Sequence, residues 1–288
     1  MSYLGHLKSN DVIRLLADPL KSGVLSLRES DGRIIGRTTP AWDTPWVHVK
    51  NSYQVNCWFW KQIIFDHIVC KQLSEGNRFV PMGCQDCYKV VARPKTVRQL
   101  FALEALQERL KHPSKCGIEI RPEVFGNYGG YFYNRGLPAG VECYKKVRQA
   151  VDEDPELGSE ILVLLKRGCT EMEMGVGPSD KWHISPEQET FETRLSQLFV
   201  TDVQVIKQSD HAKDAVRHKW LLRAWDIGDE TAKEYNDDLP FFPPYVTYHH
   251  LADEKIDATE FNEETDTKDE LARCQNNYKI MKDKTYTI

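Results

Sequence analysis

The chain has 288 residues, of which 41% are hydrophobic and 28% are charged, and its formal net charge is −5. This balance is typical of a globular protein of one or two domains, and it argues against a chain coated along its length by nucleic acid. No apolar run has the length of a transmembrane helix, and the first residues lack the pattern of a secretory signal. We therefore expect a cytoplasmic protein with no membrane partner, whose eight cysteines are reduced and serve in metal binding or in burial.

The amino-terminal part is expected to form a helix, a hairpin and a buried helix. Apolar residues at helical spacing predict the first helix over residues 10–20. Two short β-rich runs on either side of the turn at residues 31–32 predict a hairpin. The Trp-rich segment 56–73 has apolar residues three and four positions apart, which predicts a buried helix. We interpret its two cysteines, Cys57 and Cys70, as core residues, because free cysteine is one of the most buried residue types.

The middle of the chain has the clearest pattern of elements. Thr96 can cap a helix that ends before Pro113, and the remaining segments alternate between β-rich runs and one further amphipathic helix. The six elements are expected at residues 88–92, 96–110, 116–121, 131–133, 139–151 and 161–165. Their order is strand, helix, strand, strand, helix, strand, which is the split βαβ or ferredoxin-like order. The predicted fold class is therefore α+β, with a ferredoxin-like central unit.

The carboxy-terminal part is expected to be mainly helical. One helix should begin at Pro186 and another should cover residues 212–225, with a short strand at 203–206 between them. The proline-rich and aromatic run 240–248 predicts an extended arm, and an acidic tail follows it. The predicted segments are an amino-terminal hairpin and buried helix (1–79), a cysteine-containing ferredoxin-like unit (80–182), a helical segment with the arm (183–250) and the acidic tail (251–288).

Two cysteines separated by two residues, Cys84 and Cys87, are the strongest chemical signal in the sequence. Two thiolates are half of a metal site. Cys169 directly follows the fourth predicted strand, which lies beside the first strand in a ferredoxin-like sheet. Cys143 is expected in the first turn of the second helix, where backbone N–H groups stabilise a thiolate. The sequence therefore predicts a site of these four cysteines at one edge of the sheet, with Cys116 as a fifth candidate that could replace Cys143.

The spacing leaves two kinds of metal centre open. Structural zinc sites commonly use two closely spaced pairs, whereas a pair with two single cysteines is a pattern that cubane clusters also use. We prefer a [4Fe–4S] cluster and keep zinc as the alternative. Two basic residues beside Cys169, Lys166 and Arg167, could offset the charge of four thiolates.

Three classes of function follow from these features. The preferred one is an interaction or assembly component with a structural cluster, because an extended arm and an acidic tail are segments that order on a protein partner. The second is a nucleic-acid-associated protein that uses the basic residues Lys145, Lys146, Arg148, Lys166 and Arg167. The third is an iron–sulfur redox enzyme or subunit; the sequence leaves open whether the protein is an enzyme.

A further feature bears on the second class. The run Gly129-Gly130-Tyr131-Phe132-Tyr133 resembles the aromatic strand of RNA-recognition motifs, which stacks bases on an open sheet. The basic residue that precedes the glycine in that motif is replaced here by Tyr128. We expect these aromatic side chains to pack beneath the amino-terminal or carboxy-terminal segments, because the rest of the chain must lie against some surface of the sheet.

Overall fold

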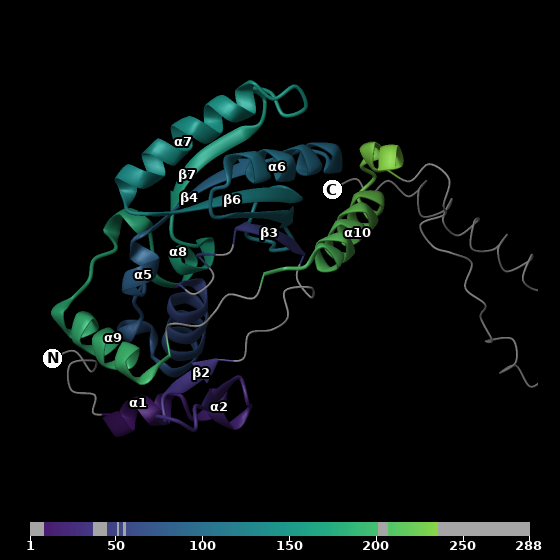
Figure 1. Ribbon diagram of the computed structural model, residues 1–288. Coiled ribbons are helices and arrows are strands. Elements are labelled where there is room, and N and C mark those ends of the chain that lie inside the picture. The colour runs from purple at the N-terminus through teal and green to yellow at the C-terminus, as the bar shows by residue number, and fades with distance from the viewer. Residues whose placement is uncertain (1–8, 37–44, 51, 54–55, 201–206, 236–288) are drawn as a thin grey trace, which may run out of the picture. The chain divides into compact units, whose positions relative to one another are not determined.

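The computed structural model describes residues 9–36, 45–50, 52–53, 56–200 and 207–235 (Figure 1). About 53% of the structure is helical and 18% is strand, which confirms the prediction of a mixed helix-and-sheet fold. The chain divides into two units, Met1–Arg223 and Ala224–Ile288. Among the described residues no helix is both long enough and apolar enough to cross a bilayer.

The helices and strands follow one another along the described part of the chain in a mixed order. The strands are β1 (Leu25–Leu27), β2 (Ile34–Gly36), β3 (Trp46–Lys50), β4 (Cys87–Arg93), β5 (Ser114–Ile118), β6 (Tyr128–Arg135) and β7 (Leu162–Arg167). The α-helices are α1 (Ser9–Leu15), α2 (Ala17–Lys21), α4 (Cys70–Gln72), α5 (Met82–Gln85), α6 (Val97–Leu110), α7 (Leu137–Asp152), α8 (Thr170–Val176), α9 (Pro186–Leu198) and α10 (Asp210–Asp226). The other helical segments are the π-helix η3 (Cys57–Val69) and the 3₁₀ turns η4 (Glu75–Asn77), η5 (Ser179–Lys181) and η6 (Glu230–Tyr235).

Five strands form one sheet in the order β3-β5-β6-β4-β7, and each neighbouring pair is antiparallel. In the middle of the sheet, Val90 of β4 lies opposite Phe132 of β6 on one side and Leu165 of β7 on the other. The start of β4 therefore lies beside the end of β7, because antiparallel strands run in opposite directions. This pairing brings Cys87 next to the turn that leads from β7 to α8.

The two faces of the sheet are covered by different parts of the chain, and successive residues of a strand point to opposite faces. On β4, Val90 and Ala92 pack with α6 and α7, whereas Cys87 and Val91 pack on the other face with Tyr53. Figure 1 shows α6 and α7 on one side of the sheet and α8 on the other. The same alternation assigns Cys87, Lys89 and Val91 to the face opposite the two long helices.

Sequence signals for helix ends are accurate in this fold. The hydroxyl of Thr96 accepts a hydrogen bond from the Gln99 backbone N–H, at a donor–acceptor distance of 3.2 Å, and α6 begins at the next residue. The hydroxyl of Ser185 accepts one from the Gln188 backbone N–H, and α9 begins at Pro186 as predicted. Both caps satisfy amide groups that the first helical turn leaves without a partner.

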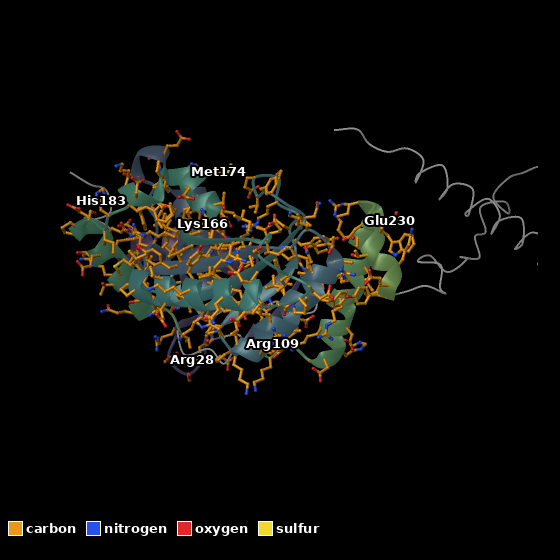
Figure 2. All side chains as sticks on the ribbon, turned by 90° about the horizontal axis from the view of Figure 1, so that it is seen from above. Arg28, Arg109, Lys166, Met174, His183 and Glu230 are labelled. Atoms are coloured by element: carbon orange, nitrogen blue, oxygen red, sulfur yellow. The ribbon has the colours of Figure 1, made fainter. Side chains whose placement is uncertain are left out.

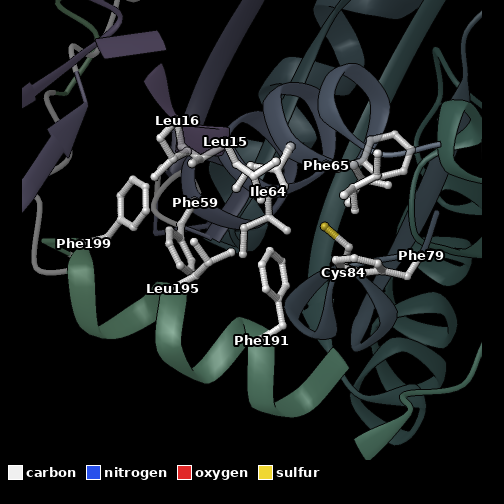
Figure 3. Close-up of a cluster of buried hydrophobic side chains, with 14 of the residues drawn as sticks. Leu15, Leu16, Phe59, Ile64, Phe65, Phe79, Cys84, Phe191, Leu195 and Phe199 are labelled. Carbon is white, nitrogen blue, oxygen red and sulfur yellow. The ribbon is translucent and has the colours of Figure 1, made fainter. Parts of the chain in front are cut away.

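The amino-terminal elements pack with η3 and α9 in one apolar cluster. The predicted hairpin is present, with Leu27 of β1 opposite Ile34 of β2. The Val200 backbone N–H donates to the carbonyl oxygen of Ile34, which ties the hairpin to the end of α9. Figure 3 shows side chains of η3 and α9, among them Ile64 and Phe191, in one buried apolar cluster.

The structure also differs from the sequence expectations. The buried helix expected over residues 56–73 is present, but thirteen of its residues form a π-helix, which is rare and is often found at functional sites. The strand β3 and the short helices α5 and α8 were not predicted. The expected strand 203–206, the arm 240–248 and the acidic tail 251–288 lie outside the described residues. The division of the chain into the four predicted segments stays a prediction.

One substitution tests the central packing of the sheet. Phe132 of β6 is fully buried between the sheet and its helices, so Phe132→Ala should lower the free energy of unfolding by about 3–5 kcal/mol. Phe125 is 85% exposed, and Phe125→Ala should change it by less than about 0.5 kcal/mol. Urea denaturation of both variants measures the difference. Equal destabilisation by the two would contradict this description of the core.

Candidate functional site

Four cysteines line one pocket on the face of the sheet opposite α6 and α7. They are Cys57, Cys84, Cys87 and Cys169, and the ammonium-bearing side chain of Lys89 lines the same pocket. Each comes from a different place in the fold: the first residue of η3, the helix α5, the first residue of β4 and the residue before α8. Residues separated by more than 100 positions in the sequence thus share one pocket.

Backbone hydrogen bonds hold the cysteine-bearing segments together. The Gly168 N–H donates to the carbonyl oxygen of Cys87 at 2.8 Å, which fixes the turn before Cys169 against the start of β4. The Arg167 guanidinium donates through Nε to the carbonyl oxygen of Gln85 at 2.7 Å. These bonds continue the β4–β7 pairing beyond the strands, so the positions of Cys87 and Cys169 are coupled.

The four thiols interact electrostatically in every pairwise combination. Burial raises the pKa of Cys57, with Lys89 acting to lower it and Cys169 acting to raise it. Burial, followed by the charges of the other three cysteines, raises the pKa of Cys84 well above its ordinary value. Burial raises the pKa of Cys87 to about 12, with Lys89 acting to lower it and Cys57 and Cys169 acting to raise it. Several thiolates in one buried pocket repel one another, and a bound cation or metal cluster would remove that repulsion.

Lys89 lines the pocket together with two other cationic residues, Lys61 and Arg135. The residue is 7% exposed, and its Nζ donates a hydrogen bond to Cys169 Sγ at 2.7 Å. Burial alone would lower the pKa of this lysine, but the thiolates of Cys169, Cys87 and Cys57 outweigh that effect and raise it. The ammonium group also lies 5.7 Å from the ring centre of Tyr133. The lining of the pocket therefore includes a buried ammonium group.

Two glycines of the pocket lining leave room for tryptophan rings that pack against them. A Cβ atom on Gly83 would come within 2.3 Å of the Trp60 ring, and one on Gly168 would come within 2.5 Å of the Trp182 ring. Gly168 also has a φ of +62°, a conformation that side chains with a Cβ atom rarely adopt. Both glycines directly adjoin pocket cysteines, so they let indole rings pack closely against the thiol-bearing backbone.

Cys84 lies at the boundary between the pocket and the apolar core. Figure 3 shows its sulfur pointing from α5 toward the side chains of Ile64 and Phe65. The Met82 backbone N–H at the start of α5 donates to a carboxylate oxygen of Glu192 at 2.9 Å. The thiol of Cys84 is thus backed by apolar side chains, while α5 is anchored by a buried carboxylate.

The structure brings together three of the cysteines proposed from the sequence and leaves two elsewhere. Cys84, Cys87 and Cys169 line the pocket, and Cys143 and Cys116 do not. Cys143 lies on α7 in the core between the helices and the sheet, with its Sγ 3.7 Å from His112 Nε2. The helix α7 begins at Leu137, so Cys143 lies in its second turn. The prediction that it lies in the first turn was wrong.

Cys116 also lies outside the pocket because of the face of the sheet on which it is found. Cys116 is fully buried on β5, and the charges that act on it belong to Glu104 and Glu108 of α6 and to Arg217 and Lys213 of α10. Cys116 therefore points from the sheet toward the helices, whereas Cys143 points from α7 toward the sheet. The sheet separates both cysteines from the pocket.

Cys57 is the pocket residue that sequence reasoning missed. We expected it to be an ordinary core residue, like Cys70, because both lie on one apolar helix. The signal that distinguishes the two is position: Cys57 begins η3, whereas Cys70 begins the short helix that follows it. The Cys57 backbone N–H donates to the carbonyl oxygen of Tyr53, another residue of the pocket wall.

The pair of basic residues expected to offset the thiolates has other contacts. Lys166 forms an ion pair with Glu173 of α8, and the Arg167 guanidinium donates to the carbonyl oxygens of Gln85 and Ser179. Met174, the next residue of α8 after Glu173, projects outward and is 69% exposed (Figure 2). The side chain of Lys89, in contrast, contacts Cys169 directly.

The aromatic residues of β6 are covered, as expected. The ring of Tyr53 stacks on that of Tyr133 with centroids 3.7 Å apart, and the ring of Trp46 packs edge-on against Tyr131. Tyr131 and Tyr133 are 6% and 9% exposed. These rings are not available to stack nucleic-acid bases.

Within the described residues, no three or more His, Cys, Asp and Glu side chains converge closely enough to hold a single metal ion. All seven cysteines in that part of the chain are free thiols. The chain matches no protein-family model, no curated protein and no solved structure at a significant level. The geometry of the pocket is therefore the basis for any assignment of function.

The buried carboxylate behind α5 gives a testable pH dependence. Burial raises the pKa of Glu192 from 4.5 to about 7, with hydrogen bonds from Gln188 and Met82 opposing the rise. The folded protein then retains a proton that the unfolded chain releases, so this group's stabilising contribution is complete below pH 4.5 and is lost as the pH rises to about 7. The loss should amount to about 3 kcal/mol.

The measurement is urea denaturation of wild type and Glu192→Gln across that pH range. The advantage of wild type over the variant should shrink as the pH rises, because glutamine does not titrate. A difference between the two proteins that stays constant across the range would show that Glu192 titrates normally.

Proposed function

We propose that Cys57, Cys84, Cys87 and Cys169 bind a [4Fe–4S] cluster that cross-links three segments of the fold. The observation that carries the proposal is the presence of all four thiols in one pocket, with every pair interacting electrostatically. A cubane cluster takes one cysteine per iron, which requires four sulfurs spread around a volume. The proposal replaces Cys143, favoured from the sequence, with Cys57.

We prefer a cluster to zinc because a cubane takes one cysteine per iron and so accommodates sulfurs that lie farther apart. One zinc ion needs its four sulfurs within about 2.3 Å of a single point, so the sulfurs must be close to one another. Zinc remains the alternative that metal analysis would identify.

We propose further that the cluster is structural and that the protein is an interaction or assembly component. The site joins the start of η3, the α5–β4 segment and the β7–α8 turn, and no disulfide joins these segments in the described part of the chain. Metal binding to such a site becomes folding free energy, on the order of 10 kcal/mol for structural zinc sites. Free thiols and a cluster both suit a reducing compartment such as the cytoplasm.

The strand order supports the finer assignment of fold. We propose that the segment from β4 to β7 is a ferredoxin-like unit, because its sheet order β5-β6-β4-β7 corresponds to two-three-one-four in chain order. The strand β3 then extends this unit at one edge. The cluster would lie at the end of the unit where β4 begins and β7 ends.

A redox role is the second candidate. The specific observation that favours it is the hydrogen bond from Lys89 to Cys169, since hydrogen bonds to cluster sulfurs tune reduction potentials. For the nucleic-acid alternative, two of the basic residues on α7 are paired with carboxylates of the same helix, Lys146 with Glu142 and Arg148 with Asp152. Those pairs weaken the case for a phosphate-binding patch there.

A panel of cysteine variants tests the site directly. After anaerobic purification, Cys57→Ser and Cys169→Ser should each lose most of the bound iron and sulfide and should lose thermal stability. Cys143→Ser is the matched control: it is a buried cysteine on the other side of the sheet and should retain the wild-type iron content. Iron and acid-labile sulfide assays provide the measurement.

The result for Cys57 separates this proposal from the sequence-based one. Full iron content in Cys57→Ser with loss in Cys143→Ser would restore the original ligand set. Stoichiometric zinc without sulfide in the wild type would replace the cluster with a zinc site.

A further inference from the structure

A chain of ion pairs lies beside the cysteine pocket, and Glu171 of α8 is in the middle of it. The carboxylate oxygen Oε1 of Glu171 lies 3.4 Å from Lys61 Nζ of η3. The other oxygen, Oε2, lies 3.2 Å from Nη1 of Arg121, which follows the end of β5. One carboxylate thus contacts cations from two separate segments of the chain.

The Arg121 end of this chain is fixed by the sheet. Arg121 donates through Nε and Nη2 to the two carboxylate oxygens of Glu119, at 2.8 Å and 2.7 Å, and the Glu119 side chain is completely buried. The Tyr131 hydroxyl of β6 donates to the same carboxylate at 2.7 Å. A bidentate pair fixes the orientation of the guanidinium, so Arg121 presents Nη1 to Glu171 in a defined direction.

The Lys61 end belongs to the segment that carries Cys57. Lys61 follows Cys57 by four positions on η3, about one helical turn, and both residues line the pocket. Glu171 follows Cys169 by two positions, in the first turn of α8. The ion pair between Lys61 and Glu171 therefore connects the beginning of η3 to the beginning of α8.

This connection reaches a cysteine that the sheet pairing does not hold. The pairing of β4 with β7 fixes Cys169 beside Cys87, whereas Cys57 comes from η3, which is not a strand of the sheet. The side chains of Lys61 and Glu171 are each only 26% exposed. Partly buried pairs are screened less by solvent and salt than exposed pairs, so this one can hold its two helices in one arrangement.

We propose that Glu171 is a positioning residue of the cysteine pocket: by binding Lys61 and Arg121 together, it sets the separation between Cys57 and Cys169. The consequence for metal binding rests on the proposed cluster, which takes one cysteine at each iron. The positioning itself concerns the protein's own residues and is measurable without a cluster.

Glu173 provides a matched control on the same helix. It lies two residues after Glu171, and its carboxylate pairs with Lys166 of β7 and not with a residue of η3. Glu173→Gln therefore removes an ion pair from α8 but leaves the link to η3 intact. The comparison separates a general loosening of α8 from the specific loss of the contact with Lys61.

The experiment uses the full chain, cluster-free and reduced, with Glu171→Gln, Lys61→Gln, the double variant and Glu173→Gln. Dibromobimane is a short reagent that joins two thiols: each new S–C bond replaces a C–Br bond and releases bromide and the thiol proton. Mass spectrometry locates the bridged peptides. The yield of the Cys57–Cys169 bridge relative to the Cys84–Cys87 bridge should be about tenfold lower in Glu171→Gln than in the wild type.

The other variants distinguish positioning from a general loss of structure. Lys61→Gln should lower the ratio as Glu171→Gln does, and the double variant should lower it little further, because the two residues act through one contact. Glu173→Gln should give the wild-type ratio. Absence of the Cys57–Cys169 bridge from the wild type, a wild-type ratio in Glu171→Gln, or an equal fall in Glu173→Gln would overturn the inference.

The second readout uses protein purified under anaerobic conditions. Loss of iron to a chelator should be about tenfold faster in Glu171→Gln than in Glu173→Gln. Absence of iron and sulfide from the wild type would contradict the proposed function, while the bridging yields would still decide the role of Glu171.

Discussion

The antiparallel pairing of β4 with β7 is the constraint on which the rest of the site depends. It brings the first residue of β4 beside the turn that follows β7, and the bond from the Gly168 N–H to the Cys87 carbonyl extends the pairing to the cysteines themselves. The alternation of side chains along β4 then directs Cys87 and Lys89 to the same face. One pairing thus brings Cys87, Lys89 and Cys169 to the same pocket.

Much of the central fold could be predicted from local signals. Thr96 and Ser185 mark helix starts because their hydroxyls satisfy free amides, and the apolar stripe of α6 requires burial. The approach of Cys169 to Cys84 and Cys87 followed from strand order alone. The π-helical hydrogen bonding of η3 could not be predicted in this way, because an apolar pattern indicates burial and does not specify which carbonyl each amide reaches.

The identity of the fourth cysteine shows where sequence reasoning reached its limit. Strand order indicates which end of the sheet a residue approaches, and Cys143 met that criterion. It does not indicate which face a residue occupies, and α7 lies on the face opposite the pocket. Cys57 reaches the pocket from a segment outside the central unit, through tertiary packing of η3 that no local pattern encodes. A cluster held by this set would make the amino-terminal elements part of the same cooperative structure as the sheet.

The most direct test of this account is native mass spectrometry of the full chain purified under strictly anaerobic conditions. We expect a species heavier than the bare polypeptide by one Fe₄S₄ unit, which dissociates when the protein is denatured. A native mass equal to that of the polypeptide alone, from protein expressed with adequate iron and sulfide, would contradict the central claim that these four thiols hold an iron–sulfur centre.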